Sequence, residues 1–297
     1  MTFSLRAWHP ISLIEYTKIV NYFSHRGGNR MEWFATLSPI IQALLATIFT
    51  WGVTALGAAV VLFFNNINKP LLDCMLGFGA GVMIAASFWS LLNPALELSE
   101  TLGSHMIWLT PALGFLVGGL FIVGSEKLLD RLYFNQWRDS NGANSLKRSL
   151  LLCSAVTLHN IPEGLAVGVA FGGVIAGIEG ASLISAILLA VGIGLQNFPE
   201  GAAVSLPLRR EGYSRIKSFL SGQASGLVEP VAGIIGAYAA ITVQSLLPFL
   251  LAFAAGAMIS VVSSELIPES AKDNKNLATV GVILGFMVMM IMDVALG

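Results

Sequence analysis

Eight long runs of apolar residues constrain the fold of this chain more than any other feature. Each run reaches the roughly 18 residues that cross a hydrocarbon core of about 30 Å as a helix. Only 11% of the 297 residues are charged, so the chain has too few polar side chains to shield these runs from water. We therefore predict an all-α polytopic membrane protein with spans at about 36–64, 71–93, 106–130, 149–175, 180–207, 216–241, 244–268 and 275–296.

The distribution of Lys and Arg predicts how these spans are oriented. Twelve of the 16 basic residues lie on the odd-numbered connections and their helix ends, four lie near the N-terminus, and none lies on connections 2–3, 4–5 or 6–7. Cytoplasmic loops carry an excess of positive charge, so the odd connections, including a long one at 131–148, are predicted to be cytoplasmic and both termini outside. We expect an extracytoplasmic tail at 1–35 before one transmembrane domain at 36–297. The net charge of −1 indicates no nucleic-acid partner.

Small side chains predict where the helices approach one another. Helices in lipid gain little from the hydrophobic effect between themselves, so close packing through small residues must hold them together. Four pairs of glycines are spaced by four residues and therefore each share a helix face: 77 and 81, 114 and 118, 168 and 172, 222 and 226. The two cysteines, Cys74 and Cys153, indicate neither a structural disulfide nor a thiolate metal site.

A polar hexapeptide occurs twice, in the fourth and the fifth predicted span. Residues 159–164 read H-N-I-P-E-G and residues 196–201 read Q-N-F-P-E-G. Consecutive spans run in opposite directions, so the two copies form an inverted pair, and both fall in the middle half of the bilayer. A charge there costs roughly 2.5–3.5 kcal/mol. The duplication of so costly a motif indicates a functional site.

The spacing within each motif indicates metal ligands. Residues four apart share a helix face, so His159 and Glu163 point the same way, as do Gln196 and Glu200. A third carboxylate, Glu229, lies before a proline in the sixth span. The metal-ligand candidates are Met83, His159, Asn160, Glu163, Gln196, Asn197, Glu200 and Glu229.

The prolines of the two motifs, Pro162 and Pro199, are predicted to open their helices. Each ring removes the helical hydrogen bond to the carbonyl four residues earlier, which belongs to Leu158 or Leu195. In hydrocarbon such a carbonyl needs a partner. A cation in a polar cavity would supply one.

The ligand types favour borderline divalent metals. Imidazole, carboxylate and amide groups suit Zn²⁺, Fe²⁺, Mn²⁺ and Co²⁺, and the Met83 thioether adds affinity for Cd²⁺. Three carboxylates at low dielectric must take protons or bind a cation, so metal affinity should depend on pH. Taken singly, His159 is as readily explained as a packing residue, and Met83 is more readily explained as one. The repeated motif at matching depth is what favours a metal site.

Five further acidic residues lie near the ends of the predicted spans. Four of them are predicted at cytoplasmic helix ends, where a solvated charge is ordinary and a metal exit path is the alternative: Asp73, Glu126, Glu265 and Glu269. Asp293, near the outer end of the eighth span, is either a charge that reaches the membrane surface or part of an entrance.

With these residues in view, the chain resembles the ZIP (Zrt-, Irt-like protein) family of metal transporters. The paired motifs carry the resemblance, and residues 75–83, 226–230 and 264–269 resemble its bacterial branch. The resemblance implies a homodimer, movement of metal into the cytoplasm, and a unit of helices 1, 4, 5 and 6 that slides against helices 2, 3, 7 and 8. It implies one metal position at Met83, His159, Glu163, Gln196 and Glu200. It implies a second at Asn160, Glu163, Asn197, Glu200 and Glu229.

The chain departs from the family pattern at two ligands and one loop. Gln196 replaces a second histidine found in many relatives, and Asn197 replaces the Asp found in several. The loss of an anionic ligand predicts one or two ions per protomer, the second weak or optional. The connection 131–148 also lacks the histidines that many relatives carry there.

We therefore expect a carrier and not an enzyme. Its substrates are divalent metals, mainly Zn²⁺, and it has no resident cofactor. We expect it in the inner membrane of a bacterium. One alternative is an intramembrane metal-dependent hydrolase, which needs fixed ligands beside an activated water, but the chain has no H-E-x-x-H motif. Another is a metal-gated sensor or channel, which saturable uptake would distinguish from a carrier.

Overall fold

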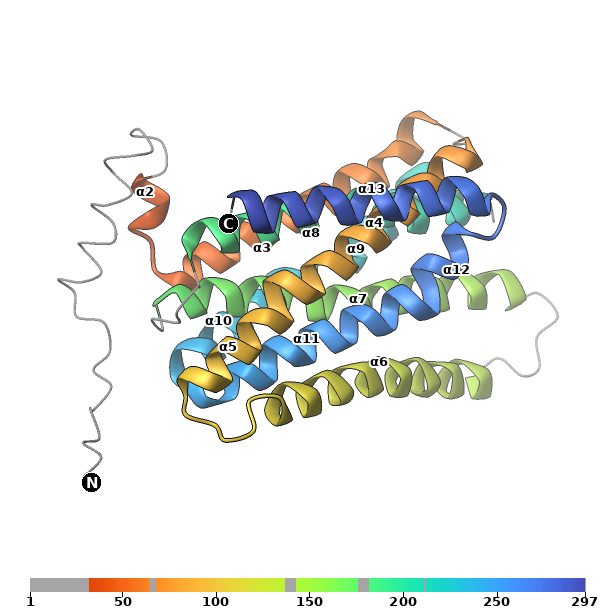
Figure 1. Cartoon of the computed structure of the whole chain (residues 1–297). Helices are drawn as coiled ribbons and strands as arrows, with labels where there is room; N and C mark the ends of the chain where they lie inside the picture. Colours follow the sequence, from red (N-terminus) through yellow and green to blue (C-terminus); the bar gives the residue numbers. More distant parts are fainter. Residues whose placement is uncertain (1–31, 65–67, 137–142, 176–181, 211, 297) are drawn as a thin grey trace, which may run out of the picture.

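The protein is a bundle of long helices in a computed structural model that describes residues 32–64, 68–136, 143–175, 182–210 and 212–296. The described residues contain no strand, and eight of their helical segments are long and apolar enough to cross a membrane. This confirms the predicted fold class (Figure 1). The spans are α3 (Pro39–Phe63); α4, η1 and α5 (Lys69–Ala86, Ser87–Leu92, Asn93–Thr101); α6 (Leu109–Gln136); α7 (Ala143–Ile175); α8 (Leu183–Arg210); α9 and α10 (Arg215–Ser225, Val228–Thr242); α11, η3 and α12 (Leu247–Val261, Val262–Leu266, Ile267–Ser270); α13 and η4 (Lys275–Ile291, Met292–Leu296).

The spans pack as two groups of four. The most extensive contacts join α7 with α10 and α3 with α8 in one group, and α4 with α13 and α6 with α11 in the other. Across the boundary, α4 packs on α8 and α11 packs on α7. The first group contains both polar hexapeptides, because one lies on α7 and the other on α8.

The four predicted glycine pairs lie at helix contacts. A Cβ atom added at Gly168 in α7 would lie 2.1 Å from the carbonyl oxygen of Gly233 in α10. One added at Gly118 in α6 would lie 1.9 Å from the carbonyl oxygen of Phe253 in α11. The pair on α4 faces the backbone of α13 in the same way. At Gly222 in α9 the added Cβ atom would instead lie 2.8 Å from the Cβ atom of Ala58 in α3. The backbones therefore touch where a side chain would keep them apart.

The prolines behave differently from the prediction. The helices α7 and α8 continue through Pro162 and Pro199, so the prediction that these rings open the helices is wrong. Helix widening occurs elsewhere, in the π-helical turns η1 and η3 that precede Pro94 and Pro268. The wider turn relieves the clash of a proline ring with the preceding turn. The second span therefore continues past its predicted end at residue 93.

Helix also occupies both ends of the predicted connection 131–148. The helix α6 continues to Gln136 and α7 begins at Ala143. At the other end of the bundle, a short helix α2 (Glu32–Ala35) precedes α3. The ring of Phe34 in α2 packs edge-on against Phe171, with centroids 5.9 Å apart. The expected tail thus begins to pack on the bundle before residue 36, while its residues 1–31 lie outside the described part.

Candidate metal site

All eight predicted ligand residues are buried inside the bundle. His159 is 5% exposed and Glu200 is 6% exposed, and the other six side chains are inaccessible. They come from four spans, because Met83 lies on α4 and Glu229 on α10, beside the motifs on α7 and α8. Burial of so many polar side chains is costly unless they are hydrogen-bonded to one another or to a ligand.

The two hexapeptides face each other in antiparallel order. The Gln196 amide donates a hydrogen bond to Glu163, with 2.6 Å between Nε2 and Oε1. At the other end of the pair, Glu200 interacts electrostatically with His159. The first residue of each motif therefore lies beside the fifth residue of the other. The predicted inverted pair brings an imidazole, an amide and two carboxylates together.

The third carboxylate, Glu229, joins this group from α10. The helix α9 ends at Ser225, and Glu229 lies in the first turn of the helix that follows. Asn197 Nδ2 lies 3.0 Å from Oε1 and 3.1 Å from Oε2 of this carboxylate. Glu163 interacts electrostatically with both Glu200 and Glu229, so the three acidic groups share one region.

Six of the eight side chains keep an atom that lacks a hydrogen-bond partner. These atoms are His159 Nε2, Asn160 Oδ1, Glu163 Oε2, Gln196 Oε1, Asn197 Oδ1 and Glu200 Oε2. Five of them are oxygens with free electron pairs, which are the atoms that coordinate cations. A buried polar atom without a partner is costly. A divalent cation would give several of these atoms a partner at once.

Met83 lies on the face of α4 that packs against the second motif. A Cβ atom added at Gly79 would lie 3.4 Å from the Cβ atom of Gln196, and Met83 is one helical turn further along the same face. Its side chain is fully buried. The thioether therefore belongs to the part of the bundle that holds the motifs.

Two acidic residues that were expected to be ordinary solvated charges approach His159. Glu265 Oε1 lies 3.4 Å from His159 Nε2. One ligand atom each of Glu126, His159 and Glu265 lie within 4.8 Å of one another. Both carboxylates are partly exposed and lie beside the imidazole, which favours the alternative prediction of a metal exit path over that of an ordinary solvated charge.

The other two acidic helix-end residues differ from each other. Glu269 is exposed, and its Oε2 atom lies 3.7 Å from Nζ of Lys272. It is therefore an ordinary solvated charge. Asp73 is 6% exposed, and its Oδ2 atom has no hydrogen-bond partner, so the prediction of a solvated charge is wrong for this residue.

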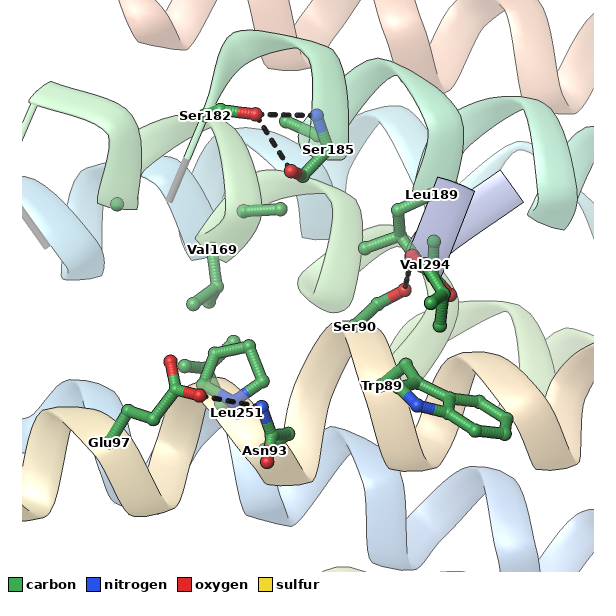
Figure 2. Close-up of a pocket in the computed structure, with 15 residues that line it drawn as sticks. Trp89, Ser90, Asn93, Glu97, Val169, Ser182, Ser185, Leu189, Leu251 and Val294 are labelled. Atoms are coloured by element: carbon green, nitrogen blue, oxygen red, sulfur yellow. Dashed lines mark hydrogen bonds between the residues drawn. The ribbon is translucent and has the colours of Figure 1, made fainter. Parts of the chain in front are cut away.

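A cavity of about 290 Å³ opens between the two groups of helices, with residues of α5 on one side and the start of α8 on the other. Figure 2 shows Ser90, Asn93 and Glu97 on one side of it and the start of α8 on the other. Asp293 lines the cavity and accepts a hydrogen bond of 2.8 Å from Ser90. Leu189 in its wall precedes Gln196 by seven residues, which is about 10 Å along a helix. The cavity thus ends about two turns from the motifs.

Two threonines of the site were missed by reasoning from the sequence. The hydroxyl groups of Thr50 and Thr54 on α3 both face the Glu229 carboxylate. Threonine is common in membrane helices and carries no motif here. The one signal was their spacing of four residues, which places both on one face of the first span.

Comparison with known proteins places the chain in a family. A model of the ZIP zinc transporter family matches residues 135–293. Zinc transporter ZIP11 of Xenopus tropicalis is 40% identical over 88% of this chain and 98% of its own length. Zinc transporter GufA of Myxococcus xanthus is 36% identical over 86% of this chain and 98% of its own length.

Zinc transporter ZupT of Streptococcus mutans serotype c is 33% identical over 84% of this chain and 96% of its own length. Vertebrate and bacterial proteins are thus both similar to the chain, so these comparisons support the family and not its bacterial branch. The family match covers more than half of the chain, and the relatives align with most of it. The chain is therefore an integral membrane protein of the ZIP zinc transporter family.

Proposed function

We propose that this protein carries divalent transition-metal ions across a membrane, with Zn²⁺ as its main substrate. The observation that carries the proposal is the buried cluster of unpartnered oxygen and nitrogen atoms on the paired motifs of α7 and α8. The relatives ZIP11, GufA and ZupT are all named zinc transporters, which supports Zn²⁺ as the substrate. Fe²⁺, Mn²⁺, Co²⁺ and Cd²⁺ are further substrates that the same ligand types suit.

The transported ion is bound by Met83, His159, Glu163, Gln196 and Glu200. The burial of these side chains and the contact between Gln196 and Glu163 support this assignment. Two carboxylates offset the charge of a dication at low dielectric, and the neutral ligands complete its coordination without further charge. Asn160, Asn197 and Glu229 surround this position.

The ion enters through the cavity beside Asp293 and leaves past Glu126 and Glu265. Asp293 has an Oδ2 atom without a hydrogen-bond partner in the cavity wall, which attracts cations. On the far side of the site, Glu265 is near enough to His159 to accept an ion from it. The Lys and Arg distribution places both termini and the Asp293 end of the bundle outside. The resemblance to the family implies that the metal moves from there into the cytoplasm.

Movement of one helix group against the other transfers the ion between the two sides. The close packing inside each group supports two rigid bodies. The ion is carried on the group that contains α7 and α8, because four of its five ligands lie there and only Met83 lies on the other group. The working unit is a homodimer, and its membrane is the inner membrane of a bacterium. An ion held by ligands on a moving group gives saturable uptake, as a carrier does.

Uptake of radiolabelled zinc into proteoliposomes tests this function. His159→Ala and Glu200→Ala each remove a ligand. Loss of a residue that only supports a metal ligand lowers affinity or activity about 10- to 100-fold, so these two changes should lower uptake by at least as much. Glu100→Gln, an exposed residue at the end of α5, serves as the control. Competition by Fe²⁺, Mn²⁺ and Cd²⁺ gives the metal ranking. Undiminished uptake by both ligand variants would exclude the proposed site.

A further inference from the structure

Hydrogen-bond donors surround the Glu229 carboxylate. Asn197 Nδ2 lies 3.0 Å and 3.1 Å from its two oxygens. The Thr50 hydroxyl contacts Oε2, and the Thr54 hydroxyl lies 3.5 Å from Oε1. All four side chains are inaccessible to solvent. A carboxylate offers about four lone-pair positions, so these donors occupy most of the positions that a metal ion would need.

The orientation of the Asn197 amide is fixed by its neighbours. Its Nδ2 atom lies 3.2 Å from the main-chain oxygen of Thr50, in addition to both Glu229 oxygens. Turning the amide over would place Oδ1 against three oxygens and would take an N–H donor away from each of them. The N–H side therefore faces Glu229. A cation placed between the two side chains would meet hydrogen atoms that carry partial positive charge.

The Thr50 side of the carboxylate is closed as well. The hydroxyl of Thr50 lies 3.0 Å from the main-chain oxygen of Thr47 and also contacts Oε2 of Glu229. Whether the proton between the two side-chain oxygens belongs to Thr50 or to Glu229, it occupies the lone pair at Oε2. On the other side, a Cβ atom added at Gly226 would lie 3.1 Å from Oε1. The backbone at Gly226 therefore lies close to that oxygen.

The other two carboxylates of the site are different. Glu163 and Glu200 each have an Oε2 atom without a hydrogen-bond partner, whereas both oxygens of Glu229 have partners. We infer that Thr50, Thr54 and Asn197 hold Glu229 out of the coordination sphere of the transported ion, so that each protomer carries one ion. Glu229 then links α10 to α3 and α8. This inference rests on the proposed function and replaces the second metal position that the family resemblance implies.

The number of zinc ions bound per protomer tests the inference. Zinc titration of the purified full-length chain, with the bound metal measured by mass spectrometry, should give one ion for the wild type and one for Glu229→Gln. Asn197→Asp should give two, because a carboxylate replaces the N–H groups and needs a cation beside Glu229. Two ions in the wild type that fall to one in Glu229→Gln would overturn the inference. Failure of the proposed function differs, since zinc binding would then be insensitive to Glu163→Gln.

The role of Thr50 as a positioning residue has its own test. Zinc-induced infrared difference spectra report which carboxylates change on binding, and Glu229 should not contribute in the wild type. Thr50→Val should add a Glu229 band that Glu229→Gln removes, while Thr50→Ser keeps the hydroxyl and restores the wild-type spectrum. Thr47→Val is the matched control, because the Thr47 hydroxyl donates only within α3. Identical spectra for Thr50→Val and Thr47→Val would contradict the positioning role.

Discussion

Met83 brings a soft sulfur to a set of ligands that is otherwise oxygen and nitrogen. Thioethers favour softer cations, so the Met83→Leu change should weaken Cd²⁺ more than Zn²⁺. Leucine has a similar volume, and such exchanges usually cost less than about 1.5 kcal/mol of stability. The measurement is the Cd²⁺ concentration that halves zinc uptake, which should rise in Met83→Leu. Met258→Leu, which changes a fully buried methionine in α11, is the control. If the Cd²⁺ concentration that halves uptake is the same in Met83→Leu and in the control, Met83 is not a ligand.

Single residues show which parts of the site the sequence could predict. The pair His159 and Glu163 was predictable because a spacing of four places both on one helix face, and a duplicated polar motif inside apolar runs marks a common depth. The approach of Glu265 to His159 was not predictable from spacing. It depends on the tertiary contact that brings η3 to His159, which no local pattern encodes. The same holds for Thr50, whose partner Glu229 is 179 residues away.

Close helix contacts make some glycines irreplaceable and others dispensable. Alanine favours a helix over glycine by about 1 kcal/mol, so a Gly→Ala change should stabilise where there is room. At Gly168 the added Cβ would lie 2.1 Å from a backbone oxygen of α10, and overpacking of this kind costs about 1–3 kcal/mol. We expect Gly168→Ala to lower the melting temperature in detergent. Gly52→Ala, with no atom within 4 Å of the added Cβ, should not lower it. Equal melting temperatures would contradict this account of the packing.

The helices themselves were predictable to different degrees. The existence of eight spans followed from run length and hydropathy, because a membrane requires both. Their ends were less certain, since helix continues past Asn93 and Pro94 in the second span through a π-helical turn. Proline chemistry alone does not decide whether a helix stops, bends or widens. The neighbouring helices decide it, and that information is not local.

The two groups of helices lead to a prediction about the whole molecule. If transport requires them to move, a covalent link across their boundary should stop it. A Cβ atom added at Gly192 in α8 would lie 3.7 Å from Cγ1 of Val82 in α4, within reach of a disulfide. It would also lie 2.4 Å from Sδ of Met289, a flexible side chain that must shift to admit the cysteine. We expect Val82→Cys with Gly192→Cys, made in a chain with Cys74→Ser and Cys153→Ser, to lose zinc uptake on oxidation. Reduction should restore it.

Chains with only one of the two new cysteines provide the control for this experiment. Val82→Cys alone and Gly192→Cys alone, in the same chain without Cys74 and Cys153, cannot form a link between α4 and α8. Oxidation should leave uptake by each of them unchanged. Uptake that persists through the oxidised link between α4 and α8 would show that the groups need not move apart there.

The central claim is that the two hexapeptides hold the transported ion between α7 and α8. X-ray absorption at the zinc edge of the zinc-loaded full-length protein examines the ion itself. We predict nitrogen and oxygen neighbours at about 2.0–2.2 Å, with imidazole scattering that disappears in His159→Ala. Imidazole scattering that persists in His159→Ala would mean that the ion is bound elsewhere, and it would contradict the claim.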